Sequence, residues 1–107
     1  MVININIENR RATLSEEVVL VCGNNGYTVE FTFDEEWSGL EEKTARFVWE
    51  SHGVRKHADA PITGSSAAVP VLSGTKEVLV GVFGGSLRST TPARIPCDYS
   101  VRCLAWE

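Results

Sequence analysis

The sequence predicts an all-β protein: a single Ig-like β-sandwich of about seven to eight mostly antiparallel strands, with one short helical turn near Asp34–Leu40. Two observations lead to this prediction. Apolar and polar residues alternate over several short segments with turn signals between them, and no long segment has helical periodicity. The chain has 107 residues, a length that suits one domain spanning residues 1–107.

Charge and composition argue against two classes of partner. The net charge is -4 and no basic stripe occurs, since the basic residues form no run longer than the dipeptides Arg10-Arg11 and Arg55-Lys56; nucleic acid is therefore not an expected partner. The longest apolar run, Val18 to Cys22, is far too short to cross a bilayer, so a membrane is not expected either. The N-terminus has no charged region typical of a signal peptide, so we expect folding in a cytoplasm.

The first half of the chain contains three candidate strands. Ile3, Ile5 and Ile7 alternate with polar residues, the pattern of a half-buried strand. The run Val18 to Cys22 is short and β-branched, which indicates a strand buried on both faces. Asn25-Gly26 then predicts a hairpin into the alternating strand Tyr27–Phe33.

The middle of the chain predicts one well-formed strand and two edge strands. Thr44 to Glu50 alternates, with Ala45, Phe47 and Trp49 on one side. Val54 to Ala60 is more polar and ends at Pro61, which suggests a sheet edge. Ala68 to Leu72 contains Pro70 and is also expected at an edge.

The last part of the chain predicts a central strand and a long final strand. Lys76 to Gly85 is apolar on both faces, so it should lie in the middle of its sheet. Gly81 within it suggests a bulge or a close backbone approach. The final strand begins near Ile95 and alternates as far as Trp106.

The stretch DEEWSGL (Asp34 to Leu40) places a tryptophan directly behind three acids. Asp34 can cap a helical turn by accepting backbone N–H groups of residue 36 or Trp37. We interpret the stretch as one helical turn between the two sheets, with Trp37 and Leu40 as a plug that closes the end of the sandwich. The alternative is an acidic groove in which Trp37 is a stacking platform for a ligand.

Two segments carry a resemblance to a known family. YTVEFTFDEEWSGLEEKTARFVWE resembles the EFTF-DEEW-GL-KTA-F segment of a family of phage and prophage structural proteins of low-GC Gram-positive bacteria. VGVFGG followed by TTPARIP resembles that family's later segment, and together the two cover roughly half the chain. The family in turn resembles the N-terminal β-sandwich of tail and baseplate proteins.

The resemblance implies a non-enzymatic structural protein that acts through protein–protein contacts. It would work in the virion, after a stay in the bacterial cytoplasm before assembly, with other subunits of the same particle as partners. Many such proteins carry downstream fibre or receptor-binding modules. Because this chain ends at Glu107, we expect an adaptor or scaffold role rather than receptor binding.

No candidate catalytic, cofactor-binding or metal-binding residues emerge. His52 and His57 match no strong zinc spacing, and no CxxC occurs. Cys97 and Cys103 would lie about 20 Å apart in one strand, beyond disulfide reach. Cys22 could pair with either one, but reduced, buried cysteines are the favoured state.

The end of the last strand is the candidate subunit interface. Arg102, Leu104 and Trp106 share one face, and residue types of this kind are enriched at interface anchors. They predict contact with a second copy in a homo-oligomer; alternatively, Trp106 folds over the open end of its own sandwich. Two other functions stay open: a carbohydrate- or ligand-binding module that uses Trp37, Trp49 or Trp106, and, ranked last, an enzyme with a reactive cysteine.

Overall fold

The computed structural model describes residues 2–21, 26–37, 42–51, 53–72, 75–84 and 88–98. Within these ranges the chain forms ten β-strands and one short 3-10 turn. The elements are β1 (Val2–Glu8), β2 (Arg11–Leu14), β3 (Leu20–Val21), β4 (Thr28–Phe33), the 3-10 turn Glu35–Trp37, β5 (Lys43–Ser51), β6 (Val54–Pro61), β7 (Ser66–Ala68), β8 (Glu77–Gly84), β9 (Arg88–Ser89) and β10 (Ala93–Asp98).

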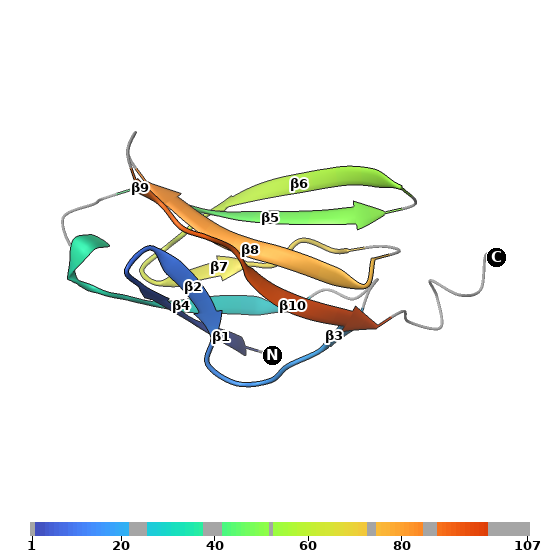
Figure 1. The fold of residues 1–107 in the computed structure, drawn as a ribbon, viewed down its shortest axis with the longest axis horizontal. Coiled ribbons are helices and arrows are strands. Elements are labelled where there is room, and N and C mark those ends of the chain that lie inside the picture. The colour runs from blue at the N-terminus through green and yellow to red at the C-terminus, as the bar shows by residue number, and fades with distance from the viewer. Residues whose placement is uncertain are drawn as a thin grey trace.

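The strands form two sheets that lie face to face (Figure 1). One sheet has the order β2-β1-β4-β7, and the other has the order β3-β10-β8-β5-β6, with β9 paired to β8. Six of the strand pairs are antiparallel, and two pairs, β1 with β4 and β10 with β3, are parallel. The predicted all-β sandwich of mostly antiparallel strands is confirmed.

The core lies between the two sheets and contains side chains from both of them. Burial alternates strictly along β1, where Ile3, Ile5 and Ile7 face inward. In the opposite sheet, Phe47 of β5 and Val80 of β8 are adjacent in register and fully buried. The buried apolar side chains form one cluster that runs from Ile3 to Cys97. A shared core of this kind is what one domain requires.

The predicted edge strands are found at edges. β6 ends the five-strand order and β7 ends the four-strand order. β7 is shorter and begins earlier than expected, since it stops at Ala68 and Val69 to Leu72 continue as irregular chain. A proline at position 70 lacks the N–H that would extend the ladder, which accounts for the early end.

Two predictions in the first half of the chain are wrong. The strand expected over Val18–Cys22 is only Leu20–Val21 in the described chain, and it has one buried face: Leu20 is 1% exposed, whereas Val19 is 46% exposed. A hairpin through Asn25-Gly26 is excluded because β3 pairs with β10 in one sheet and β4 pairs with β1 in the other. β3 belongs to a sheet of which one face packs on the core and the other faces outward, so only its inward face needs apolar residues.

A hairpin that the sequence analysis missed joins β1 to β2. Asn9 and Arg10 form its two-residue loop, and both have positive φ, at 53° and 61°. This is the backbone of a type I′ turn, which usually selects glycine in its second position. The loop is held from outside: Asp34 Oδ2 accepts the N–H of Asn9 at 2.9 Å, and the carbonyl of Arg10 accepts the N–H of Thr91 at 3.0 Å.

The helical turn predicted near Asp34–Leu40 is present as the 3-10 turn Glu35–Trp37. Its cap differs from the expected one. The backbone carbonyl of Asp34, rather than its side chain, accepts the N–H of Trp37 at 3.2 Å. The Asp34 side chain instead accepts the N–H of Asn9 through Oδ2.

In the described part of the chain there is no helix of the length and apolarity needed to cross a membrane.

Candidate functional site

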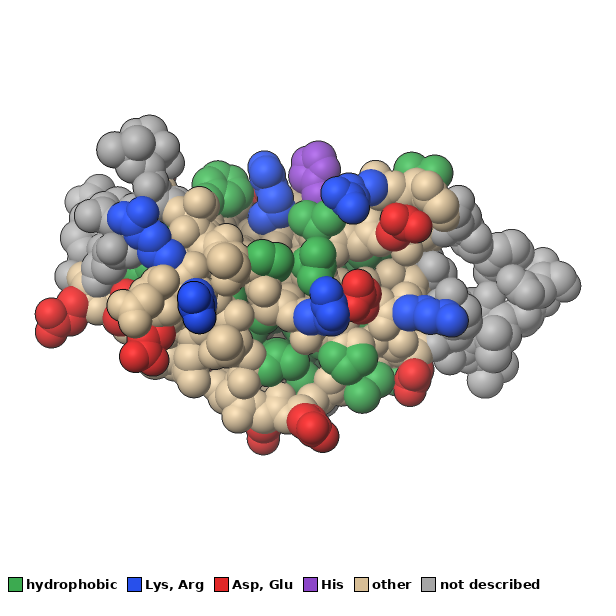
Figure 2. All heavy atoms as spheres, viewed as in Figure 1, with side chains coloured by type: hydrophobic (Ala, Val, Ile, Leu, Met, Phe, Trp, Pro, Cys, Tyr) green, Lys and Arg blue, Asp and Glu red, His purple; other side chains and the backbone are tan. Residues whose placement is uncertain are grey.

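The described residues form a groove of about 870 Å³ on the outer face of the sheet that contains β5 and β8. Its floor is formed by β5 and β8. One of its ends lies at the β5–β6 turn and the segment Thr75–Glu77, and Ser89 to Pro92 contribute another part of the wall. Figure 2 shows this face, with hydrophobic side chains gathered at its centre and Lys and Arg side chains around them.

The floor of the groove is apolar although it faces away from the core. Val48 of β5 lies opposite Leu79 of β8, and Phe83 lies further along β8. All three are only half-buried. An outward face of a sandwich strand normally carries polar residues. A hydrophobic strip here is therefore a feature that packing within this domain does not require.

Arg46 packs on one residue of the strip, Phe83, and forms an ion pair beside it. Arg46 stacks over the ring of Phe83, with its guanidinium carbon 4.9 Å from the ring centroid. The same guanidinium binds Asp59 of β6 through two bonds, Nε to Oδ1 at 2.7 Å and Nη2 to Oδ2 at 2.9 Å. These bonds lower the pKa of Asp59 below its ordinary value, chiefly through the hydrogen bonds from Arg46, with smaller electrostatic contributions from Arg46 and His57.

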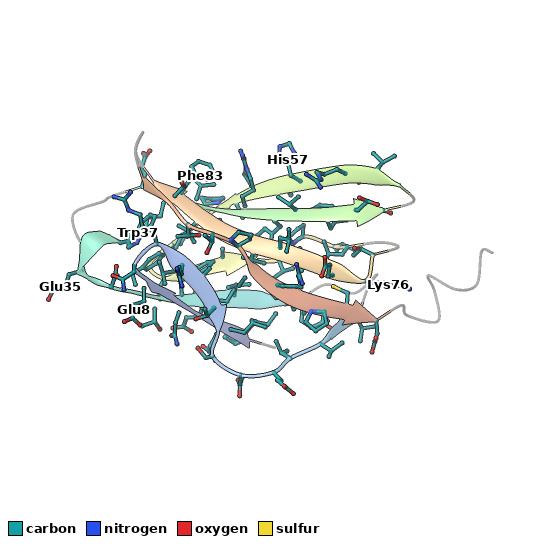
Figure 3. The ribbon with its side chains drawn as sticks, in the orientation of Figure 1. Glu8, Glu35, Trp37, His57, Lys76 and Phe83 are labelled. Atoms are coloured by element: carbon teal, nitrogen blue, oxygen red, sulfur yellow. The ribbon has the colours of Figure 1, made fainter. Side chains whose placement is uncertain are left out.

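The other charges around the groove are of both signs. Arg94 of β10 binds Glu77 of β8, with Nε 3.0 Å from Oε2. Glu50 and Arg55 line the groove near the β5–β6 turn and face each other across the two strands. In Figure 3, Phe83 and His57 lie along the upper part of the sheet and Lys76 lies at the far end from Phe83.

A glycine lets one wall of the groove approach the floor. A side chain at Gly81 would place its Cβ 3.2 Å from Thr90 Oγ1 and 3.8 Å from the Cα of Pro92. Thr90 is bound to β8 at this point, because its N–H donates to the carbonyl of Val82 at 2.9 Å and its hydroxyl accepts the N–H of Val82 at 3.0 Å. The close approach expected from Gly81 is thus present.

Trp37 is at the opposite end of the molecule from Lys76 (Figure 3). Its side chain is 0% exposed, and its ring lies 5.7 Å from that of Phe33. This is the location that a plug requires, and a ring so enclosed is not available as a surface platform for a ligand. Leu40, the other half of the predicted plug, lies outside the described residues.

The residues of the predicted subunit interface also lie outside the described residues. These are Arg102, Leu104 and Trp106.

Of the three cysteines, Cys22 and Cys103 lie outside the described residues. Cys97 is 6% exposed, and its thiol donates to the carbonyl of Ile95 with a sulfur–oxygen distance of 3.7 Å. A thiol in this position is shielded from reagents.

Four buried polar atoms in the described chain have no hydrogen-bond partner. Two of them, Asp34 Oδ1 and Trp37 Nε1, are in or beside the 3-10 turn, and two, Trp49 Nε1 and Ser51 Oγ, are near the end of β5. Trp49 is half-buried and lines the groove. Its indole Nε1 is buried, and its side chain packs against the core cluster. No group of three or more His, Cys, Asp or Glu side chains is placed to hold a metal ion within the ranges described.

Sequence reasoning did not find this groove, although one signal for it was present. Residues 76–85 are apolar on both faces, and the sequence analysis took this to mean a central strand. β8 is indeed central, between β10 and β5. Its second apolar face, however, lines the open groove rather than a second layer.

Comparison with family models, with curated proteins and with solved structures finds no match to this chain.

Proposed function

We propose that this chain is a non-enzymatic structural protein of a phage or prophage particle. It serves as an adaptor or scaffold in the tail or baseplate, and its partners are protein subunits of the same particle, other copies of this chain among them. It functions in the virion and resides in the bacterial cytoplasm before assembly. The assignment to a phage particle comes from the two sequence segments described above.

The observation that carries a role in protein–protein contact is the apolar groove. Val48, Leu79 and Phe83 form a solvent-facing strip that contributes nothing to the core. Arg46 stacks on Phe83 beside it. Protein interfaces combine an apolar and aromatic centre with arginine and with a polar rim, and this groove has the same composition.

The proposal is tested in the bacterium that carries the gene. Prophage induction is followed by purification of the particles on a density gradient and detection of the chain by mass spectrometry. We expect the native chain in the particles and a strong reduction for Leu79→Glu. Thr13→Glu is the matched control, because Thr13 is exposed on β2 in the other sheet. Particles that lack the native chain would contradict the assignment.

One observation favours a second function, a carbohydrate- or ligand-binding module. Trp49 is half-buried and is among the residues that line the groove. An aromatic residue at a groove suits a sugar or a similar flat polar ligand. Titration of tryptophan fluorescence with a panel of saccharides tests this. A saturable change that is lost in Trp49→Phe would support the module, whereas an unchanged spectrum would oppose it.

A further inference from the structure

The strand β6 is an open edge of its sheet. Among the described residues it pairs with β5 and with no second strand, and in Figure 1 it lies at the upper margin of the ribbon. With eight residues, Val54–Pro61, it is the longest edge strand in the part of the chain that the structure describes. An edge of this length presents backbone N–H and C=O groups with which another strand can pair.

The register of β5 and β6 shows which backbone groups face the open edge. The N–H of Ile62 donates to the carbonyl of Lys43 at 3.0 Å, in line with the pairs along β6. Bonded and non-bonded pairs alternate in an antiparallel ladder. The even-numbered residues of β6 therefore bond to β5, whereas the N–H and C=O groups of Arg55, His57 and Asp59 point away from it.

The side chains of these three residues lie on the outer face of the sheet. All three are exposed, and Figure 3 shows His57 directed away from the body of the molecule. Across the strand pair, Arg55 is opposite Glu50. Asp59 is opposite Arg46, to which it is bonded. Opposite charges thus stand at equal distances on either side of His57.

A second copy of β6 is complementary to this edge. If two β6 strands pair antiparallel about a two-fold axis at His57, Arg55 of each copy faces Asp59 of the other. Asp59 can keep its bonds to Arg46, since a carboxylate has about four lone-pair sites. The row across four strands then reads Glu50, Arg55, Asp59 of the second copy and Arg46 of the second copy, and its charges alternate in sign. Within one chain Arg55 and Asp59 are about 13 Å apart along β6, so the two residues meet only between copies.

The neighbouring registers lose this match. The next register in one direction places Arg55 opposite His57 of the second copy and removes Asp59 from any basic partner on β6. The next register in the other direction places Arg55 opposite Pro61, which has no N–H to give to a ladder. The register centred on His57 is the one that satisfies both charges and the backbone.

The opposite face of β6 gains apolar contact in the same register. Val54 is 57% exposed in the single chain. It comes to lie opposite Ala60 of the second copy, and Lys56 comes to lie opposite Ala58. Cross-strand neighbours of this kind stabilise a sheet. The pairing therefore covers an exposed valine without placing like charges opposite each other.

We propose that two copies of this chain associate edge to edge through β6, antiparallel and centred on His57, so that their two sheets become one. About six backbone hydrogen bonds form, from Arg55, His57 and Asp59 of each copy. Charged residues on an edge strand can also serve to prevent pairing. On β6, however, the charges are placed in the order that matches a second copy. The inference specifies the contact between copies that the proposed function includes, and the contact is closed by its two-fold symmetry.

The first test compares solution masses, measured by light scattering at high micromolar concentration. We expect two chains for the native protein and one chain for Arg55→Glu, because an acid at position 55 faces Asp59 of the second copy. Lys56→Glu is the matched control. It makes the same change of charge one residue further on, where the partner is Ala58, and it should remain a dimer. A monomeric native chain would overturn the inference.

The second test is complementation between two defective chains. Asp59→Lys should also be a folded monomer, with folding verified by circular dichroism, because two basic residues then face each other across the axis. Mixed with Arg55→Glu, it should form a species of two chains. In that species an acid at position 55 faces a lysine at position 59, and Asp59 faces Arg55. A mixture that remains monomeric would refute this register.

The third test removes one backbone donor from the edge. His57→Pro deletes an N–H that β5 does not use, and edge strands accept proline, so the variant should fold but remain a monomer. His57→Thr keeps the N–H and should remain a dimer. A folded His57→Pro that still forms a dimer would show that the β6 edge is not the contact.

The inference and the proposed function fail in different ways. Leu79→Glu, on the floor of the groove, should leave the mass of the native dimer unchanged. If it dissociates the dimer while Arg55→Glu does not, the groove is the contact between copies, and pairing through β6 is wrong although the proposed function stands. Particles that lack the native chain would contradict the proposed function and leave a measured β6 dimer in place.

Discussion

Trp37 is the residue whose surroundings most clearly explain an odd sequence. It follows Asp34, Glu35 and a third acid, and yet its side chain is 0% exposed. The 3-10 turn resolves the conflict, because it turns successive side chains to different sides. The ring of Trp37 points inward onto Phe33, and Glu35 is exposed.

Truncation of Trp37 should cost a large share of the stability. We expect Trp37→Ala to lower the free energy of unfolding by ~3–5 kcal/mol, because it leaves a large cavity at the end of the sandwich. Chemical denaturation measures the change. Trp49→Ala is the control and should cost less, since Trp49 is half-buried. A loss below about 1 kcal/mol for Trp37→Ala would show that the ring is not part of the packed core.

The pair Arg46–Asp59 predicts a local pH effect. Arg46 lowers the pKa of Asp59, chiefly through its hydrogen bonds. Arg46→Gln should therefore raise the pKa of Asp59 towards its ordinary value, as measured by an NMR titration of the carboxyl group. Arg55→Gln is the control, because Arg55 lies opposite Glu50 rather than Asp59, and it should leave this pKa unchanged.

The sign of the stability effect follows from the direction of that shift. A carboxyl whose pKa is lower in the folded state stabilises the fold above its unfolded pKa. This contribution is lost as the pH falls through the folded value. The difference in stability between the native chain and Arg46→Gln should thus shrink on acidification. It should be small at every pH, because both side chains are partly exposed.

Among the elements, β8 contributes residues both to the core and to the groove on the outer face of its sheet. Its inward residues Val78, Val80 and Val82 are buried in the core, and its outward residues Leu79, Gly81 and Phe83 line the groove. Gly81 is the only one of the outward three without a side chain. At that point the segment Thr90–Pro92 approaches most closely.

A side chain at Gly81 should therefore loosen the wall of the groove. We expect Gly81→Val to destabilise the protein by roughly 1–3 kcal/mol, because it overpacks against Thr90, which is bonded to Val82. Thr32→Val, at an exposed position of β4, is the control and should change stability by less than about 0.5 kcal/mol. Equal stability of Gly81→Val and the native chain would show that the wall can move freely.

At the scale of the whole molecule, one core joins the two sheets. The buried cluster contains residues of β1 and β4 from one sheet and of β5, β8 and β10 from the other. We therefore expect a single cooperative unfolding transition, with calorimetric and van't Hoff enthalpies that agree. Differential scanning calorimetry measures both. Two resolved transitions would contradict the prediction that residues 1–107 form one domain.

The sequence alone determined the class of fold and the main strands. Alternation along β1, β4 and β5 predicts strands, since a period of two places every second side chain in the core. The position of the helical turn was predicted correctly, although its N–H acceptor is the Asp34 carbonyl rather than the expected Asp34 side chain. The edge positions of β6 and β7 could be predicted because prolines cannot donate to a ladder. The burial of Trp37 was also expected.

Only the tertiary structure decided which strands are neighbours and which apolar face stays open. Asn25-Gly26 is a strong hairpin signal, yet β3 and β4 belong to different sheets, because long-range pairing with β10 and β1 determines where they go. Likewise, the sequence of β8 shows two apolar faces but does not reveal that one is uncovered. That depends on β5, which lies beside β8 and extends the strip with Val48. Burial is a property of the assembled sheets, so a local pattern specifies which residues can be buried and not what covers them.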